Sequence, residues 1–157
     1  MTTAKNPTSL TILSDREIVM TRVFDAPREL VFKAYTDPQS IPRWWGLNST
    51  TTTVDKMDVR PGGAWRFVES DANGQYAFHG EYREIVPPER LVQTFEYEGM
   101  PGKVIVDTLE FEDLGGKTRL TVTSLFASLE DRDGMLATGM EGGANESWDR
   151  LAALLKE

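Results

Sequence analysis

Cysteine is absent from this sequence of 157 residues, and histidine occurs once, at His79. Without cysteine the chain can form no disulfide, and it has no thiolate to act as a nucleophile or a metal ligand. One histidine cannot complete the histidine and cysteine sets that bind zinc. The carboxylates Glu130, Asp131 and Asp133 lack the downstream glutamate of a calcium loop and are more typical of the start of a helix. We therefore expect neither a metal nor another cofactor.

Positive charge is also scarce. The chain has 17 Lys and Arg residues against 25 Asp and Glu residues, which gives a net charge of -8. The basic residues do not gather with stacking aromatics in the way that nucleic-acid grooves require. The composition therefore argues against a nucleic-acid partner.

Long apolar runs are missing as well. No segment approaches the roughly 18 apolar residues of a membrane span. The stretch Met1 to Ser14 lacks the apolar core of about 7–15 residues that a secretion signal needs. We expect a cytoplasmic protein with a flexible leader over residues 1–12 and a single domain over residues 13–157.

Two short helices are expected after the first strand. That strand runs from about Arg16 to Asp25. Pro27 is suited to the first helical position, and apolar residues then recur at helical spacing until Pro38. A second helical turn over Gln39–Trp45 ends with two adjacent tryptophans.

A series of short strands follows, because β-branched and aromatic runs alternate with turns rich in glycine, proline and asparagine. Over Asn145–Lys156 the pattern changes, and apolar residues share one helical face instead. The sequence therefore predicts an α+β fold in which a curved antiparallel sheet of six or seven strands wraps around a long C-terminal helix. The expected strands cover residues 50–59, 64–70, 75–85, 90–97, 104–112 and 117–126.

Three glycines, Gly139, Gly142 and Gly143, precede the C-terminal helix. Each costs about 1 kcal/mol relative to alanine inside a helix. They either break the segment into a loop, or they allow a strand or a ligand to approach the helix backbone closely. The pattern leaves both alternatives open.

Five segments carry a family resemblance. They are FDAPRELVFKAYTDPQSIPRWWG, RPGGAWRF, GEYREIVPPERLVQTFEY, GGKTRLTVT and GGANESWDRLAALL. In this order, between Arg16 and Glu157, they resemble the START-like (SRPBCC) superfamily, in the branch of the heat shock protein 90 ATPase activator homologues. The resemblance implies a helix-grip fold with a deep cavity between the sheet and the last helix. Relatives use this cavity for lipids, polyketides and other hydrophobic molecules.

Strand alternation selects residues for the wall of that cavity. Trp65 and Phe67 share one face of their strand, and Phe78 and Tyr82 share a face of the next. Without a cavity such aromatics would be ordinary core residues. With the cavity that the resemblance implies, the predicted ligand-binding residues are Trp45, Trp65, Phe67, Phe78, Tyr82, Phe95, Asp107, Met135, Met140 and Trp148.

Two titratable residues bear on catalysis. Asp107 alternates in phase with Ile105 and Leu109, which would place its carboxylate inside, where it could orient a ligand or act as a general base. A bulge or an edge position would instead expose it harmlessly. Regular pleating sends His79 to solvent, in a surface or structural role, unless a bulge at Gly80 reverses the alternation.

We expect this protein to bind a small hydrophobic or amphipathic molecule, and we assign no catalytic residue. A cyclase-like, hydrolase-like or dehydratase-like enzyme that uses a cavity acid or tyrosine is one alternative. A co-chaperone-like interaction protein is another, although the co-chaperone that gives the family its name also depends on a separate N-terminal domain, so we do not expect a chaperone partner. The sequence leaves a homodimer open.

Overall fold

The structure, a computed structural model, describes residues 8–157. This part of the chain forms eight strands and four helices. In chain order they are β1 (Ser9–Ser14), β2 (Glu17–Phe24), α1 (Arg28–Thr36), α2 (Ile41–Trp44), β3 (Thr51–Met57), β4 (Ala64–Asp71), β5 (Gly74–Val86), β6 (Arg90–Tyr97), β7 (Ile105–Asp113), β8 (Thr118–Leu125), α3 (Leu129–Ala137) and α4 (Met140–Leu154).

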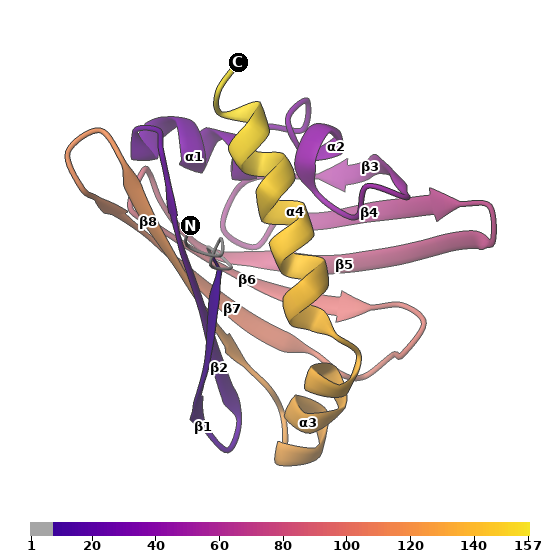
Figure 1. Cartoon of the computed structure of the whole chain (residues 1–157). Helices are drawn as coiled ribbons and strands as arrows, with labels where there is room; N and C mark the ends of the chain where they lie inside the picture. The colour runs from indigo at the N-terminus through magenta and orange to yellow at the C-terminus, as the bar shows by residue number, and fades with distance from the viewer. Residues whose placement is uncertain (1–7) are drawn as a thin grey trace, which may run out of the picture.

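The strands form one sheet in the order β1-β2-β8-β7-β6-β5-β4-β3, and all neighbouring strands are antiparallel. The sheet curves, and α4 lies across its concave face (Figure 1). The helices α1 and α2 lie near the C-terminal end of α4, and α3 lies near its N-terminal end (Figure 1). This arrangement confirms the predicted α+β helix-grip fold.

The predicted number of strands was too low because β1 was not expected. Ser9–Ser14 pairs with β2 in a register that begins at Ser9↔Thr21, so the two short helices follow the second strand instead of the first. Of the predicted leader, residues 1–7 lie outside the described residues, whereas residues 9–12 form part of β1. The strand is at the edge of the sheet and most of its side chains are exposed. Ser9 to Ile12 alternates polar and apolar residues, but Leu13 ends the alternation after four residues, which is at the short limit of a strand signal.

Polar contacts hold the second half of α4 against both flanks of the fold. On one side, the buried Arg22 of β2 donates to Asp149 at 2.7 Å. On the other side, Ser147 accepts a hydrogen bond from the Gly46 amide at 3.2 Å and donates to the Trp44 carbonyl at 3.2 Å. These anchors fix the helix above the sheet and determine how much space remains between them.

The glycine segment before the predicted C-terminal helix turns out to be mostly helical. Gly139 has a left-handed backbone, with φ of 78°, and it turns the chain between α3 and α4. Gly142 and Gly143 lie inside α4, which begins at Met140, earlier than predicted. The loop alternative therefore holds only at Gly139.

Ser128 provides a local test of this fold, because it caps α3. Its hydroxyl accepts a hydrogen bond from the Asp131 amide at 3.1 Å. We expect Ser128→Ala to lower the free energy of unfolding by about 1 kcal/mol, measured by urea denaturation followed by circular dichroism. Ser128→Asp, which keeps an acceptor at this position, serves as the control. Equal stability of Ser128→Ala and the wild type would contradict the capping role.

Candidate functional site

Two adjoining chambers lie between the sheet and the helices. The helix-side chamber, between the sheet and α4, has a volume of about 570 Å³. The loop-side chamber, bordered by α3 and the loop between β6 and β7, has a volume of about 520 Å³. Several residues border both chambers, so the two spaces lie next to each other. The shared residues are Leu47, Glu69, Phe78, Phe95, Ile105, Phe126, Met135 and Thr138.

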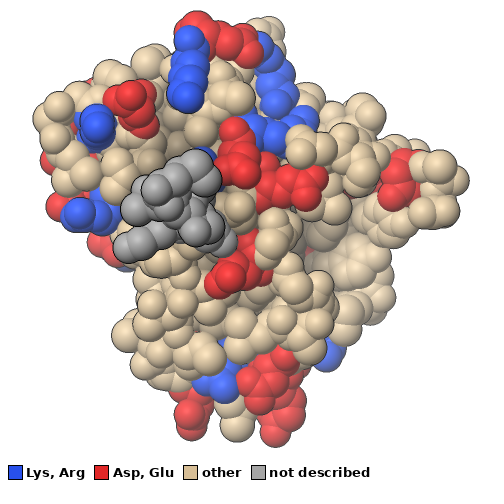
Figure 2. Space-filling model, in the orientation of Figure 1, with Lys and Arg blue, Asp and Glu red and all other residues tan. Residues whose placement is uncertain are grey.

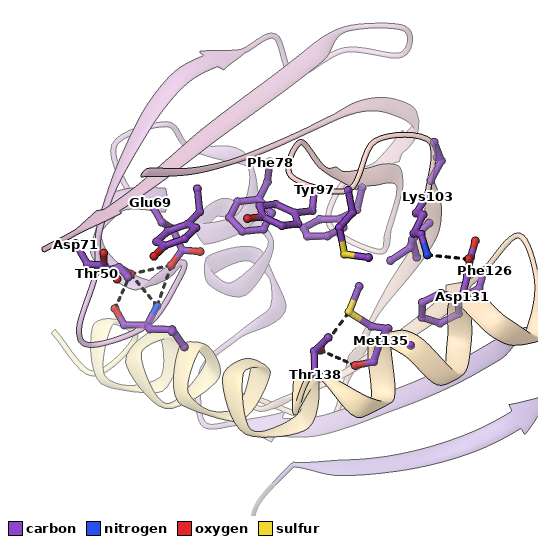
Figure 3. Close-up of a pocket in the computed structure, with 17 residues that line it drawn as sticks. Thr50, Glu69, Asp71, Phe78, Tyr97, Lys103, Phe126, Asp131, Met135 and Thr138 are labelled. Atoms are coloured by element: carbon purple, nitrogen blue, oxygen red, sulfur yellow. Dashed lines mark hydrogen bonds and ion pairs between the residues drawn. The ribbon is translucent and has the colours of Figure 1, made fainter. Parts of the chain in front are cut away.

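An aromatic wall runs along the sheet side of both chambers. The Phe78 ring lies at its centre, with ring centroids 5.2 Å from Trp45, 5.5 Å from Phe95 and 5.1 Å from Tyr97. In Figure 3, Phe78 and Tyr97 lie side by side on the sheet side of the pocket, and Met135 lies across from them on the helical side. An apolar ligand would meet ring faces and edges along this whole wall.

The structure brings most of the predicted site residues to this cavity. Those that line it are Trp45, Phe78, Phe95, Asp107, Met135, Met140 and Trp148. Trp65, Phe67 and Tyr82 are buried but line neither chamber, so for them the prediction of a cavity wall was wrong. Alternation correctly placed Trp65 and Phe67 on the inner face, where they pack beside aromatics that do line the cavity: the Phe67 ring centroid lies 5.2 Å from Trp45 and that of Trp65 lies 6.0 Å from Phe95.

Three polar side chains cross the sheet side by side on the floor of the helix-side chamber. Gln93 of β6 is paired in register with Asp107 of β7, and Asp107 is paired with Ser124 of β8. Cross-strand partners point to the same face of a sheet. All three residues line the helix-side chamber. We call Gln93, Asp107 and Ser124 the polar row.

Asp107 lies inside the fold, and neither an edge position nor a bulge exposes it to bulk solvent. Its strand is central, and the register shift in the neighbouring sheet region falls in β5 between Tyr82 and Glu84. Ser124 donates a hydrogen bond to Asp107 at 2.6 Å. Burial raises the pKa of Asp107 to about 6, and the Ser124 hydrogen bond partly opposes this rise.

Tyr35 of α1 adds a hydroxyl group to the same chamber. The Trp148 indole donates to this hydroxyl at 2.8 Å. Burial raises the pKa of Tyr35 well above its usual range; the Trp148 hydrogen bond opposes the rise and the nearby charge of Asp107 adds to it. Among residues 8–157, no hydrogen-bond acceptor is found for the Tyr35 proton, so this proton is available to a ligand.

Glu69 places a second carboxylate at the junction of the two chambers. Its side chain is only 9% exposed. One oxygen accepts hydrogen bonds from the Thr50 hydroxyl at 2.7 Å and the Leu47 amide at 3.2 Å (Figure 3). The sequence analysis did not select Glu69, although it alternates in phase with Trp65 and Phe67 and the same pattern would have found it.

An ion pair stands at the far end of the loop-side chamber from Glu69 (Figure 3). Lys103, in the loop between β6 and β7, lies 3.5 Å from Asp131 of α3. Met100 in the same loop is exposed and also lines this chamber. The chamber is therefore in contact with solvent at this end.

His79 lies outside the cavity. It is 42% exposed, and its ring nitrogens lie 2.9 Å from Glu98 and 3.4 Å from Glu96. Arg66 donates two further hydrogen bonds to Glu98, at 2.8 and 3.0 Å. The Arg66 hydrogen bond, followed by that of His79, lowers the pKa of Glu98 to about 2. His79 thus belongs to a charged network on the outer face of the sheet, where regular pleating places it.

The curved sheet, the C-terminal helix and the interior cavity together define a START-like protein. The family model described as Activator of Hsp90 ATPase homolog 1-like protein matches residues 25–156, and the chain belongs to this family. A search of curated proteins finds no significant match. Within residues 8–157, no helix has the length and apolar character that a membrane crossing demands.

Solved structures of similar proteins cover nearly the whole chain. Protein Ms6760 from Mycobacterium smegmatis is 26% identical, with a TM-score of 0.85 and coverage of 95% of this chain and 97% of that one. A protein from Rhodobacter sphaeroides is 25% identical, with a TM-score of 0.89 and coverage of 95% and 98%. A protein from Arthrobacter aurescens is 25% identical, with a TM-score of 0.86 and coverage of 94% and 91%.

Proposed function

We propose that this protein binds a small hydrophobic or amphipathic molecule in the helix-side chamber. The observation that carries this proposal is the chamber itself, with a volume of about 570 Å³ and a lining that is mainly apolar and aromatic. Pockets for small molecules usually have volumes of about 300–1,000 Å³, apolar walls and a few polar groups that fix orientation. The polar row and the Tyr35 hydroxyl are such groups.

The distribution of side chains sets the direction in which a ligand would lie. Its apolar part would pack against Trp45, Phe78 and Phe95, and its polar end would meet Asp107 on the floor. Trp45 and Trp148 line the same chamber, so binding should change tryptophan fluorescence.

Two adjacent glycines of α4 offer a matched pair of variants that tests this proposal. Gly143 lines the helix-side chamber, whereas Gly142 is exposed, and a Cβ atom placed there would have no other group within 4 Å. Leucine at either position should favour the helix by about 1 kcal/mol, but only at position 143 would it enter the chamber. With Nile red as a neutral probe, we expect Gly143→Leu to weaken binding by at least about tenfold, because overfilling costs about 1–3 kcal/mol.

Gly142→Leu is the control and should bind Nile red like the wild type. The measurement is the rise in Nile red fluorescence on titration with protein, with circular dichroism to verify that both variants are folded. Equal binding by the two variants would contradict binding in this chamber.

Acid–base catalysis on the bound molecule is a second candidate function. It is favoured by Asp107, whose raised pKa of about 6 suits a general base near neutral pH. Ser124 and Tyr35 border the same chamber and could orient a substrate. Chromatography coupled to mass spectrometry, applied to a ligand after prolonged incubation with the protein, separates the two functions: recovery of the unchanged ligand supports a binding protein, and a product or isomer that disappears with Asp107→Asn supports an enzyme.

A further inference from the structure

The charged side chains that line the cavity are nearly all acidic. Among the described residues, Lys103 is the single cation in the lining of either chamber, and Asp131 pairs with it at 3.5 Å. The lining contains neither arginine nor histidine. Its carboxylates are Glu69, Asp71, Asp107 and Asp131. An anionic ligand, such as a fatty acid or a phosphate ester, would find no free positive charge here.

Glu69 and Asp107 are the two acids of the helix-side chamber, and neither has a cationic partner within residues 8–157. Each has one oxygen that accepts hydrogen bonds, from Thr50 and Leu47 for Glu69 and from Ser124 for Asp107. A carboxylate in apolar surroundings is costly unless a positive charge or several donors compensate it. Both acids therefore leave room for a positively charged donor.

The aromatic wall also favours a positively charged group. The rings of Trp45, Phe78, Phe95 and Tyr97 border the chambers that the acids face. A cation near such ring faces is attracted by their quadrupoles, and an ammonium group gains from both the rings and a carboxylate. Acidic side chains also gather along α4 (Figure 2), which carries Glu141 and Glu146 in addition to Asp149, the ion-pair partner of Arg22. This surface charge would attract a cation and repel an anion before it enters.

We infer that the ligand is a hydrophobic amine, whose ammonium group binds at Asp107 with Glu69 adding negative charge, and whose apolar body packs on the aromatic wall. The inference rests on the proposed function, because it names the class of ligand for the same chamber. Carboxylates and phosphates of the same size are disfavoured by the negative charge of the lining.

Affinity for the amine should also depend on pH. The groups beside Asp107 are the uncharged Gln93 and Ser124 of β6 and β8, and the titratable residues Tyr35 of α1 and Glu69 of β4 line the same chamber. The residues of α4 that border the chamber are Met140, Gly143, Ala144, Ser147 and Trp148, none of which titrates. Because burial raises the pKa of Asp107 to about 6, protons compete with the amine at lower pH. Amine binding should therefore weaken as the pH falls below 6.

Three naphthalene derivatives of matched size test the inference: 2-naphthylmethylamine, 2-naphthylmethanol and 2-naphthoate. At pH 7.5 we expect the amine to bind about 10- to 100-fold more tightly than the alcohol, because hydrogen bonds to charged groups contribute about 1.5–3 kcal/mol. The carboxylate should bind most weakly. Calorimetric titration measures all three. Equal affinities, or tightest binding of the carboxylate, would overturn the inference while leaving a hydrophobic binding function intact. Binding of none of the three, together with no binding of Nile red, would instead count against the proposed function.

Substitutions locate the ammonium site. Asp107→Asn should reduce the preference for the amine over the alcohol by about tenfold or more, and should remove the weakening of amine binding below pH 6. Glu110→Gln makes the same change of charge on the exposed face of the same strand and should leave the preference unchanged. If Asp107→Asn leaves the preference unchanged, the inference is wrong, whatever the effect of Glu69→Gln.

Discussion

Asp107→Asn is expected to raise the free energy of unfolding at pH 7.5 by about 2 to 3 kcal/mol. In the folded protein, burial raises the pKa of this carboxyl from 3.8 to about 6. Each pKa unit corresponds to about 1.4 kcal/mol of differential stability. Above pH 6 the folded protein must hold an ionised carboxylate in a poorly solvated position, whereas the unfolded chain holds it in water. Asparagine removes this cost, and its side-chain oxygen can still accept the Ser124 hydrogen bond.

The sign of the pH dependence follows from proton binding. Between pH 4 and pH 6 the folded protein keeps a proton on Asp107 that the unfolded chain has lost, so stability contributed by this group falls as the pH rises. We expect the stability difference between Asp107→Asn and the wild type to grow over this interval and to stay constant above it. Chemical denaturation at several pH values measures the difference. Glu110→Gln is the matched control, and a flat difference across the interval would contradict the raised pKa.

Gly80→Ala is expected to lower the free energy of unfolding by at least about 3 kcal/mol, the upper end of what overpacking usually costs. A methyl group at Gly80 would lie 1.9 Å from the carbonyl oxygen of Thr94 and 2.6 Å from the Trp65 indole nitrogen. Both neighbours are fixed, since Thr94 belongs to β6 and Trp65 is buried in the core. The neighbouring Glu81 amide donates to the Thr94 hydroxyl at 2.9 Å, so β5 and β6 approach closely at this point.

Gly142→Ala provides a comparison for this variant. It adds the same methyl group at a position with no other group within 4 Å, and inside α4 it should stabilise the protein by about 1 kcal/mol. Urea denaturation of both variants separates a packing effect from a general effect of glycine replacement. Stability of Gly80→Ala equal to that of the wild type would show that the two strands can separate without cost.

Alternation predicted which face of the sheet a side chain occupies. Whether an inward-facing side chain also reaches the cavity depends on the segments that pack around it. Trp65 and Phe67 are on the inner face as expected, yet they line neither chamber, whereas their ring neighbours Trp45 and Phe95 do. The phase of Asp107 was evident from its own strand. Whether that strand is central or at an edge depends on pairing with β6 and β8, which local sequence does not reveal.

The Tyr35 hydroxyl shows a second limit of sequence reasoning. Tyr35 shares the apolar stripe of α1, so spacing marks it only as a core residue. Its polar role arises from contact with Trp148, more than a hundred positions away along the chain. Helix and strand patterns were sufficient for the architecture, because each element buries one face. The polar groups of the cavity depend on which distant elements meet, and for this the three-dimensional structure was needed.

The anchors of α4 are unevenly placed along the helix, and this affects which ligands the protein can accept. Hydrogen bonds to the rest of the fold involve Asn145, Glu146, Ser147, Asp149 and Arg150. Within the described chain, residues 140–144 form no such bond to the sheet, and they follow the turn at Gly139. The first turns of the helix are therefore held by apolar packing of Met140 and Ala144, whereas hydrogen bonds hold the later turns. The N-terminal end of α4 would then tolerate ligands of different length. The polar row on the sheet beneath it would discriminate between ligand head groups.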